Sequence, residues 1–142
     1  MPMIDIYAPT STFADTRALA QAAAATLMRI EQVPDIPMFR DNTAAFVHEL
    51  PADAVSTVSG ESANIRVQVL TNAGALDRDK QLATVEQLTA LVTAAAAAGW
   101  GGRVWVLLTE AVPGGWGLAG HANTNDELVA AARAEIARPQ AH

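Results

Sequence analysis

The 142-residue sequence contains no cysteine, and only one of its nine basic residues is a lysine. Without cysteine the chain forms no disulfide bond, and thiolate catalysis and zinc–thiolate sites are excluded. Acidic residues outnumber basic ones, giving a formal net charge of −6, which argues against nucleic acid and anionic membrane as partners. Because the other basic residues are arginines, we expect an anionic substrate to be held mainly by guanidinium groups.

Long hydrophobic runs are also missing. No apolar stretch approaches the roughly 20 residues that cross a membrane, and the first residues lack the basic region of a signal peptide. We therefore expect a soluble cytoplasmic protein without a membrane partner. The three histidines show no metal-ligand spacing and no glycine-rich phosphate loop is present, so the sequence predicts neither a metal site nor a cofactor.

The order strand, helix, strand occurs twice along the chain. In the first half, residues 3–9 alternate as a strand, a helix follows Thr12 to about Glu31, and residues 43–50 read as a strand. A connection over residues 52–63 leads to the second half, with a strand at 65–70, a helix at 76–98 and a strand at 103–109. Aligning residues 13–19 with 76–82 places the halves 63 residues apart.

These elements predict one α+β domain over residues 1–142. Its parts are a first β-α-β unit (2–61), a second unit with a hairpin (62–120), and a C-terminal helix and tail (121–142). A helical crossover makes the two strands of each unit parallel. The simplest closure is a four-stranded mixed sheet with both helices on one face.

The two helices are expected to bury apolar stripes against that sheet. The stripes are Leu19, Ala22, Ala23, Leu27 and Ile30 in the first helix, and Leu82, Val85, Leu88 and Val92 in the second. The opposite sheet face would carry Asp5, Tyr7, Arg66 and Gln68. That face is too polar for a second core layer and too apolar overall for water, so we expect it to form an oligomer interface.

Pro2 follows the initiator methionine at the head of the first strand. If Met1 is removed, Pro2 becomes a secondary amine at the chain terminus. A free α-amino group has a pKa of about 7.7–8.0; apolar burial or a nearby cation lowers that pKa, and a nearby carboxylate raises it. Pro2 is therefore a candidate general base or acid.

Three features together carry a family resemblance. They are the Pro-Met-Ile-Asp-Ile start at residues 2–6, the 63-residue offset, and a strand end at 107–110 followed by Gly-Gly-Trp-Gly-Leu-Ala-Gly at 114–120. Over about residues 2–120 the sequence resembles the tautomerase superfamily, which includes 4-oxalocrotonate tautomerase and macrophage migration inhibitory factor. The resemblance implies tandem β-α-β units, a homotrimer and catalysis by the amino-terminal proline.

The resemblance also implies roles for single residues. Pro2 matches the catalytic proline, and Trp116 matches the hairpin aromatic that covers the pocket. Trp105 falls where the family places an arginine or a tyrosine from a neighbouring subunit. Arg29 falls close to a histidine of the cis-dehalogenase-like members and is the best candidate to clamp a carboxylate.

The chain departs from the family pattern at two places. Thr12 stands where 4-oxalocrotonate tautomerase has a substrate-binding arginine, and Asn72 and Ala75 stand where the haloacrylate dehalogenases carry an arginine pair. Asn72 remains a substrate-binding candidate, although asparagine is common in turns for backbone reasons. His48, on the second strand, is a further candidate, with a structural role as its alternative.

The sequence thus predicts a tautomerase-like isomerase that acts on a small 2-oxo acid. Neutral Pro2 would take the hydroxyl proton of the enol and deliver it to carbon, Arg29 with Asn72 would hold the carboxylate, and the two tryptophans would exclude water. The alternatives are a decarboxylase, hydratase or dehalogenase of the superfamily with cationic Pro2, or a non-catalytic trimeric binding protein. The carboxylate that keeps Pro2 cationic would be Asp41, Glu49 or Glu110.

Overall fold

The computed structural model describes residues 1–139, so the last three residues of the predicted tail lie outside the described residues. Four strands form one mixed sheet in the order β2-β1-β3-β4. They are β1 (Met3–Pro9), β2 (Ala44–Leu50), β3 (Asn64–Thr71) and β4 (Arg103–Glu110). β1 is parallel to β2, β3 is parallel to β4, and β1 and β3 pair antiparallel at the centre. The predicted α+β fold of two joined β-α-β units is confirmed.

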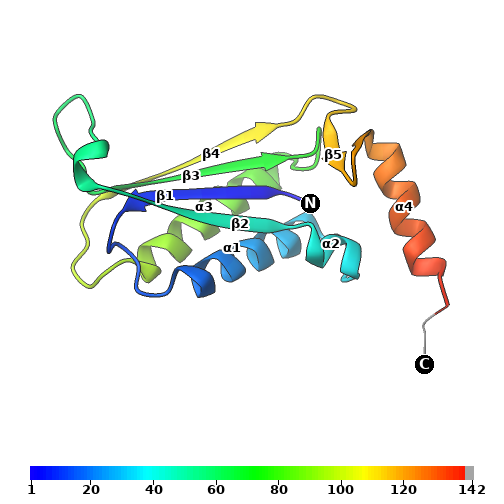
Figure 1. Cartoon of the computed structure of the whole chain (residues 1–142), viewed down its shortest axis with the longest axis horizontal. Coiled ribbons are helices and arrows are strands. Elements are labelled where there is room, and N and C mark those ends of the chain that lie inside the picture. The colour runs from blue at the N-terminus through cyan, green and yellow to red at the C-terminus, as the bar shows by residue number, and fades with distance from the viewer. Residues whose placement is uncertain (140–142) are drawn as a thin grey trace.

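Helices α1 (Thr16–Glu31) and α3 (Arg78–Ala95) lie side by side on one face of this sheet (Figure 1). Each begins after an aspartate that caps its first turn: Asp15 accepts the Ala18 N–H and Asp77 accepts the Lys80 N–H. The first helix therefore starts later than the sequence predicted. The Thr12 hydroxyl instead donates to the Pro9 carbonyl at 2.7 Å, in the turn that leaves β1.

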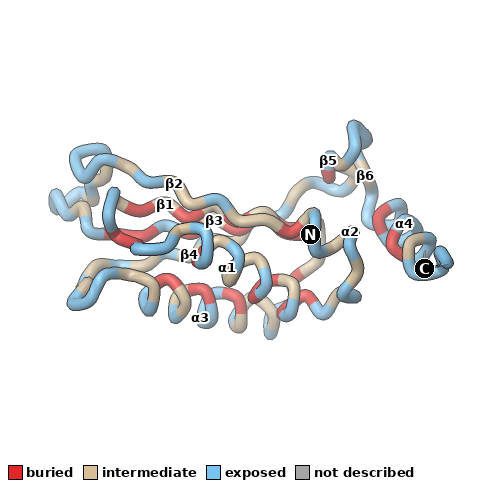
Figure 2. The backbone as a smooth tube through the Cα atoms, turned by 60° about the horizontal axis from the view of Figure 1, so that its bottom comes forward, coloured by how far each residue is buried: buried red, intermediate tan, exposed pale blue. Residues whose placement is uncertain are grey.

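The core fills the space between the helices and the sheet, and Figure 2 shows its buried stretches on β1, β3 and α3. The apolar stripe predicted for α1 is buried as expected, except that Ala22 is only partly buried. The predicted stripe of α3 is wrong in its first half, because Leu82 and Val85 are 52% and 38% exposed. Thr84 takes the inward position, since it lies four residues before Leu88 on the buried face.

Four further elements gather at one end of the sheet. They are the short helix α2 (Pro37–Asp41), the hairpin strands β5 (Trp116–Leu118) and β6 (His121–Asn123), and helix α4 (Asn125–Ala137). Figure 1 shows the N-terminus at the same end of the sheet. A 3₁₀ turn, η1 (Ala52–Ala54), lies at the opposite end, between β2 and β3 (Figure 1). α4 begins with a capping box of Thr124 and Glu127, and α2 was not predicted. Within residues 1–139 no helix is long and apolar enough to cross a membrane.

Among residues 1–139, no helix covers the second face of the sheet (Figure 1). Its polar centre joins β1, β2 and β3: His48 Nε2 lies 2.7 Å from Asp5 Oδ1, and the His48 ring stacks on Tyr7 at 4.4 Å between centroids. The Arg66 guanidinium also lies near Tyr7, with its central carbon 5.5 Å from the Tyr7 ring centroid. Large apolar side chains surround the polar centre and are exposed; they are Phe46, Leu70, Trp105 and Leu107.

The corrected phase of α3 can be tested with two chemically identical substitutions. Leu88→Ala removes a fully buried side chain and is expected to lower the free energy of unfolding by about 2–5 kcal/mol. Leu82→Ala, on the exposed side of the same helix, should change it by no more than about 0.5 kcal/mol. Urea unfolding followed by circular dichroism measures both; equal losses would contradict the phase.

Candidate active site

The first two residues are enclosed at the head of the central strand. Met1 is 3% exposed and the Pro2 side chain is fully buried. The Pro2 carbonyl accepts the Ala44 N–H at 3.3 Å, which fixes the start of β1 against β2. Met3 pairs with Ala44 on one side and with Leu70 on the other. Continued by one residue, this register places Pro2 between Thr43 and Thr71.

The terminal amine of Met1 meets a carboxylate in this enclosed space. It donates to Glu31 Oε1 at 3.3 Å, and both side chains are almost fully buried. Burial lowers the pKa of the Met1 amine below its usual range, and the Glu31 carboxylate opposes that shift. Glu31 is the last residue of α1, and its backbone carbonyl accepts a hydrogen bond from Lys80 Nζ at 3.3 Å. The site thus combines a desolvated amine with a fixed carboxylate.

Two buried polar groups near the terminus have no hydrogen-bond partner among the described residues. They are the Thr43 hydroxyl and the Asn72 side-chain amide nitrogen. Thr43 precedes β2 beside Pro2, and the β1–β3 register, continued by two residues, places Asn72 opposite Met1. A buried donor without a partner costs free energy unless a ligand satisfies it. Both groups are therefore available to bind the polar part of a small molecule.

An apolar cluster, called here the Met1 cluster, lies against the terminus. Its buried members are three: Met1, which precedes β1, Trp116 in the hairpin and Leu128 in α4. Partly buried apolar residues complete it: Met3, Met38, Phe39, Ala111 and Leu118. Elements far apart in the sequence therefore converge on Met1.

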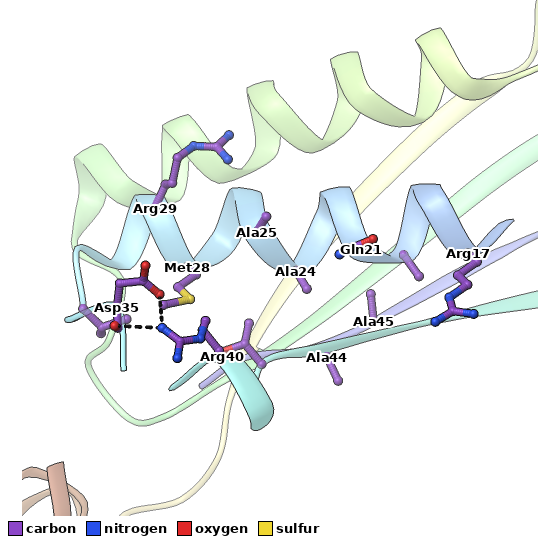
Figure 3. Close-up of a pocket in the computed structure, with 13 residues that line it drawn as sticks. Arg17, Gln21, Ala24, Ala25, Met28, Arg29, Asp35, Arg40, Ala44 and Ala45 are labelled. Atoms are coloured by element: carbon purple, nitrogen blue, oxygen red, sulfur yellow. Dashed lines mark hydrogen bonds and ion pairs between the residues drawn. The ribbon is translucent and has the colours of Figure 1, made fainter. Parts of the chain in front are cut away.

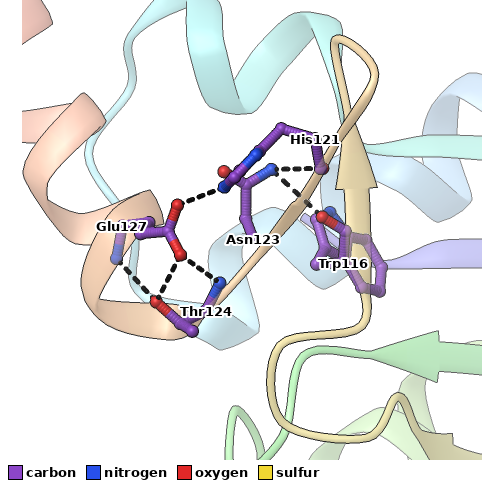
Figure 4. Close-up of polar contacts among 5 residues, drawn as sticks. All are labelled: Trp116, His121, Asn123, Thr124 and Glu127. Carbon is purple, nitrogen blue, oxygen red and sulfur yellow. Dashed lines mark hydrogen bonds and ion pairs between the residues drawn. The ribbon is translucent and has the colours of Figure 1, made fainter.

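A polar network holds the hairpin and α4 together beside this cluster (Figure 4). Asn123 Nδ2 donates to the carbonyls of Trp116 and His121, at 3.1 and 2.9 Å. His121 pairs with Glu127 in the first turn of α4, and this hydrogen bond lowers the pKa of the Glu127 carboxyl. Because Trp116 and Leu128 come from the two joined elements, the network fixes their relative position.

The structure brings together some of the sequence-predicted site residues. Pro2, Trp116 and, by register, Asn72 lie at the same end of the sheet. Arg29 lines a groove that neither Pro2 nor Trp116 lines, and its side chain points toward α3 (Figure 3). His48 lies on the open sheet face, paired with Asp5.

Trp105 also lies on the open face, on β4 and half-exposed. Arg40, in the groove with Arg29, is engaged by Asp35 at 2.8 Å, as Figure 3 shows. Trp105 is not one of the apolar residues of the Met1 cluster in the described part of the chain. In a single copy of the chain, the terminus is thus surrounded by apolar groups, Glu31 and two free polar groups.

Glu31 was missed by the sequence analysis, which named Asp41, Glu49 and Glu110 instead. Glu49 pairs with Ala8 near the far end of β1, and Glu110 accepts the Gly74 N–H at 3.1 Å. The signal for Glu31 was its spacing: it lies four residues after Leu27, on the buried face of α1. A charged residue on an apolar stripe needs a partner, and here that partner is the chain terminus.

No protein-family model and no curated protein matches this sequence. Solved structures match the fold. A fused 4-OT, a wild-type symmetric trimer, is 19% identical with a TM-score of 0.69, covering 89% of this chain and 98% of its own. A macrophage migration inhibitory factor-like protein from Entamoeba histolytica is 15% identical with a TM-score of 0.65, covering 84% and 96%. The FG41 malonate semialdehyde decarboxylase is 19% identical with a TM-score of 0.63, covering 96% and 99%.

Proposed function

We propose that this chain, which has the tautomerase superfamily fold, is an enzyme that loses Met1 and uses the Pro2 nitrogen as a general base. Its reaction would be keto-enol tautomerisation of a small 2-oxo acid or related carbonyl compound. The observation that carries the proposal is the enclosure of the terminus, because burial lowers the pKa of an amine there and so favours the neutral form that accepts a proton.

The proton balance of the reaction is simple. The neutral Pro2 nitrogen takes the proton of the enol hydroxyl, and the electron pair of that O–H bond forms the carbonyl. The carbon–carbon double bond supplies the pair that accepts the proton back from the Pro2 ammonium at the neighbouring carbon. The enzyme returns to its starting state, so one group serves first as base and then as acid.

Other residues would position the substrate around this nitrogen. The unpartnered amide of Asn72 and hydroxyl of Thr43 are suited to bind the substrate's oxygen atoms. Trp116, buried beside the terminus, would cover the substrate and exclude water, which strengthens electrostatic interactions within the site. Arg29 would reach the substrate's carboxylate only after its side chain changes position. His48 and Trp105 lie on the open face and would take part only at the site of a neighbouring copy.

Replacement of Pro2 tests the proposal directly. Mature protein should accelerate ketonisation of phenylenolpyruvate, and Pro2→Ala should lower kcat/KM at least about a hundredfold, since general acid–base groups contribute about 10²–10⁴-fold. Mass spectrometry of both proteins confirms that Met1 is absent. A rate no higher than that of buffer in the unsubstituted protein would contradict the proposed base and favour a non-catalytic binding protein.

A second candidate function rests on Glu31. Its carboxylate lies 3.3 Å from the terminal amine of Met1, and the Pro2 nitrogen is within about one residue length, 3.3–3.6 Å, of that amine along the chain. A carboxylate at this range favours the protonated amine. Cationic Pro2 would then polarise or protonate the substrate, as a hydratase, decarboxylase or dehalogenase of this fold requires.

The two functions respond oppositely to loss of the Glu31 charge. Glu31→Gln should lower the pKa of the Pro2 amine, because the carboxylate stabilises its charged form. If Pro2 is a neutral base, the acidic limb of the kcat/KM profile moves to lower pH by about one unit or more. If Pro2 acts as a cation, hydration or decarboxylation at pH 7 slows instead. Glu86→Gln, the same change on the exposed side of α3, is the control and should shift nothing.

The open sheet face supports a homotrimer. Phe46, Trp105 and Leu107 are exposed on it beside the paired Asp5 and His48, and apolar patches of this kind mark interaction surfaces. The fused 4-OT that shares the fold is a trimer. A trimer of this chain would cover the face and bring residues of one copy toward the site of the next.

Light scattering after size exclusion tests this assembly. The unsubstituted protein should elute with three times the mass of the chain. Leu107→Arg, which puts a charge on the open face, should give a monomer because a buried charge without a partner is costly. Leu82→Arg, at a similarly exposed site on α3, should remain trimeric. A monomeric unsubstituted protein would contradict the interface.

A further inference from the structure

We propose that Lys80 is a positioning residue: it holds the end of α1 so that the Glu31 carboxylate stays against the chain terminus, and through Glu31 it sets the protonation of the terminal amine. Lys80 is the only lysine of the chain and takes no part in the proposed proton transfer. The inference rests on the proposed function, because the amine concerned becomes the Pro2 nitrogen once Met1 is removed.

Lys80 occupies an unusual place for a lysine. It lies in the first turn of α3, where the helix dipole disfavours a cation. Asp77 accepts the Lys80 backbone N–H at 2.9 Å and so fixes this turn. Although aspartates stand at 77 and 79, Lys80 Nζ forms no ion pair within residues 1–139. It reaches across to α1 instead and donates to the Glu31 carbonyl at 3.3 Å.

The bond from Lys80 completes the end of α1. The last carbonyls of a helix have no partner within the helix, and a cation there is favourable. α1 ends at Glu31, and the next residue, Gln32, is left-handed with a φ of 59°. The Gln32 N–H bonds to the Arg29 carbonyl at 3.1 Å. Lys80 supplies a donor for the Glu31 carbonyl from the neighbouring helix, so the last turn of α1 is held by α3.

The Glu31 side chain needs this support. It is 5% exposed, and its hydrogen bond to the terminal amine, at 3.3 Å, is the one that the structure records for its carboxylate. A buried carboxylate loses its hydration, and helix ends fray. When the last turn of α1 is free to move, Glu31 therefore turns toward water. The clamp on the Glu31 backbone keeps the side chain inside.

Lys80 acts on the terminal amine in two ways that have opposite signs. As a nearby cation it lowers the pKa of the amine; by holding the Glu31 carboxylate in place it raises that pKa. Loss of the Lys80 side chain therefore raises the amine pKa if only the direct charge matters. The same loss lowers the amine pKa if positioning of Glu31 dominates, which is the effect that we infer.

Glu31 is the charged side chain that acts on the terminal amine in the described part of the chain. Other charged groups of the surrounding elements are exposed or bonded elsewhere. They are Asp41 in α2, Glu110 at the end of β4, Glu135 in α4, and Arg29, Asp77 and Asp79 beside Lys80. A change in the amine pKa after substitution of Lys80 thus reports on Glu31.

A nuclear magnetic resonance titration of protein labelled with ¹⁵N-proline tests the inference without any substrate. Of the seven prolines, only a terminal one has a nitrogen that titrates. In mature protein, Lys80→Met should lower the pKa of the Pro2 amine by about half a unit or more. Lys80→Gln, which is too short to reach α1, should give the same fall, and Lys80→Arg, which keeps a donor and the charge, should prevent it.

A double-mutant cycle separates positioning from direct charge. With Glu31→Gln already in place, Lys80→Met should no longer lower the amine pKa, because no carboxylate remains to be held. Arg78→Met, which removes a charge from an exposed position of the same turn of α3, is the control and should leave the pKa unchanged. A rise in the pKa, or the same fall with and without Glu31, would overturn the inference.

Two further results distinguish this inference from the proposed function. The predicted fall in the amine pKa in protein that does not accelerate ketonisation would support the role of Lys80 and contradict the tautomerase. If Met1 is retained, no proline titrates, which contradicts Pro2 as the base. ¹⁵N-methionine then reports the Met1 amine, and the same fall there in Lys80→Met would still support the clamp, whereas no fall would overturn it.

Discussion

The site depends on one constraint, the enclosure of the chain terminus at the head of a central strand. β1 has a neighbour on each side, and the Pro2 carbonyl is already bonded to β2. The terminus therefore cannot fray as most termini do. It is held against the end of α1, where Glu31 meets it. A nitrogen that is fixed, desolvated and next to one carboxylate is a group whose protonation the fold can control.

The two faces of the sheet have different roles. One face buries Ile4, Ile6 and their neighbours under α1 and α3 and supplies stability. The other face is left to polar pairs and exposed apolar side chains, which suits assembly with further copies. The end of the sheet, between these faces, collects α2, the hairpin and α4 around Met1. The chemistry proposed for this protein lies at that end.

The sequence was sufficient to predict the sheet and its two covering helices. Strand alternation and capping residues are local signals, so they survive without tertiary information. The phase of α3 failed because apolar residues occupy both sides of that helix and Thr84 is buried. α2 was missed because it spans only five residues and begins at Pro37; proline usually signals the end of a helix but also fits its first turn.

Glu31 was missed for a different reason: its partner is the chain terminus, which no spacing rule connects to residue 31. Arg29 lies two residues earlier, about 200° around the helix, and so faces away from that partner. The central claim is that the working nitrogen belongs to Pro2, and the intact mass of protein purified from its own host tests it most directly. The account predicts a mass lower than that of the full sequence by one methionine residue. A fully active protein that still carries Met1 would contradict it.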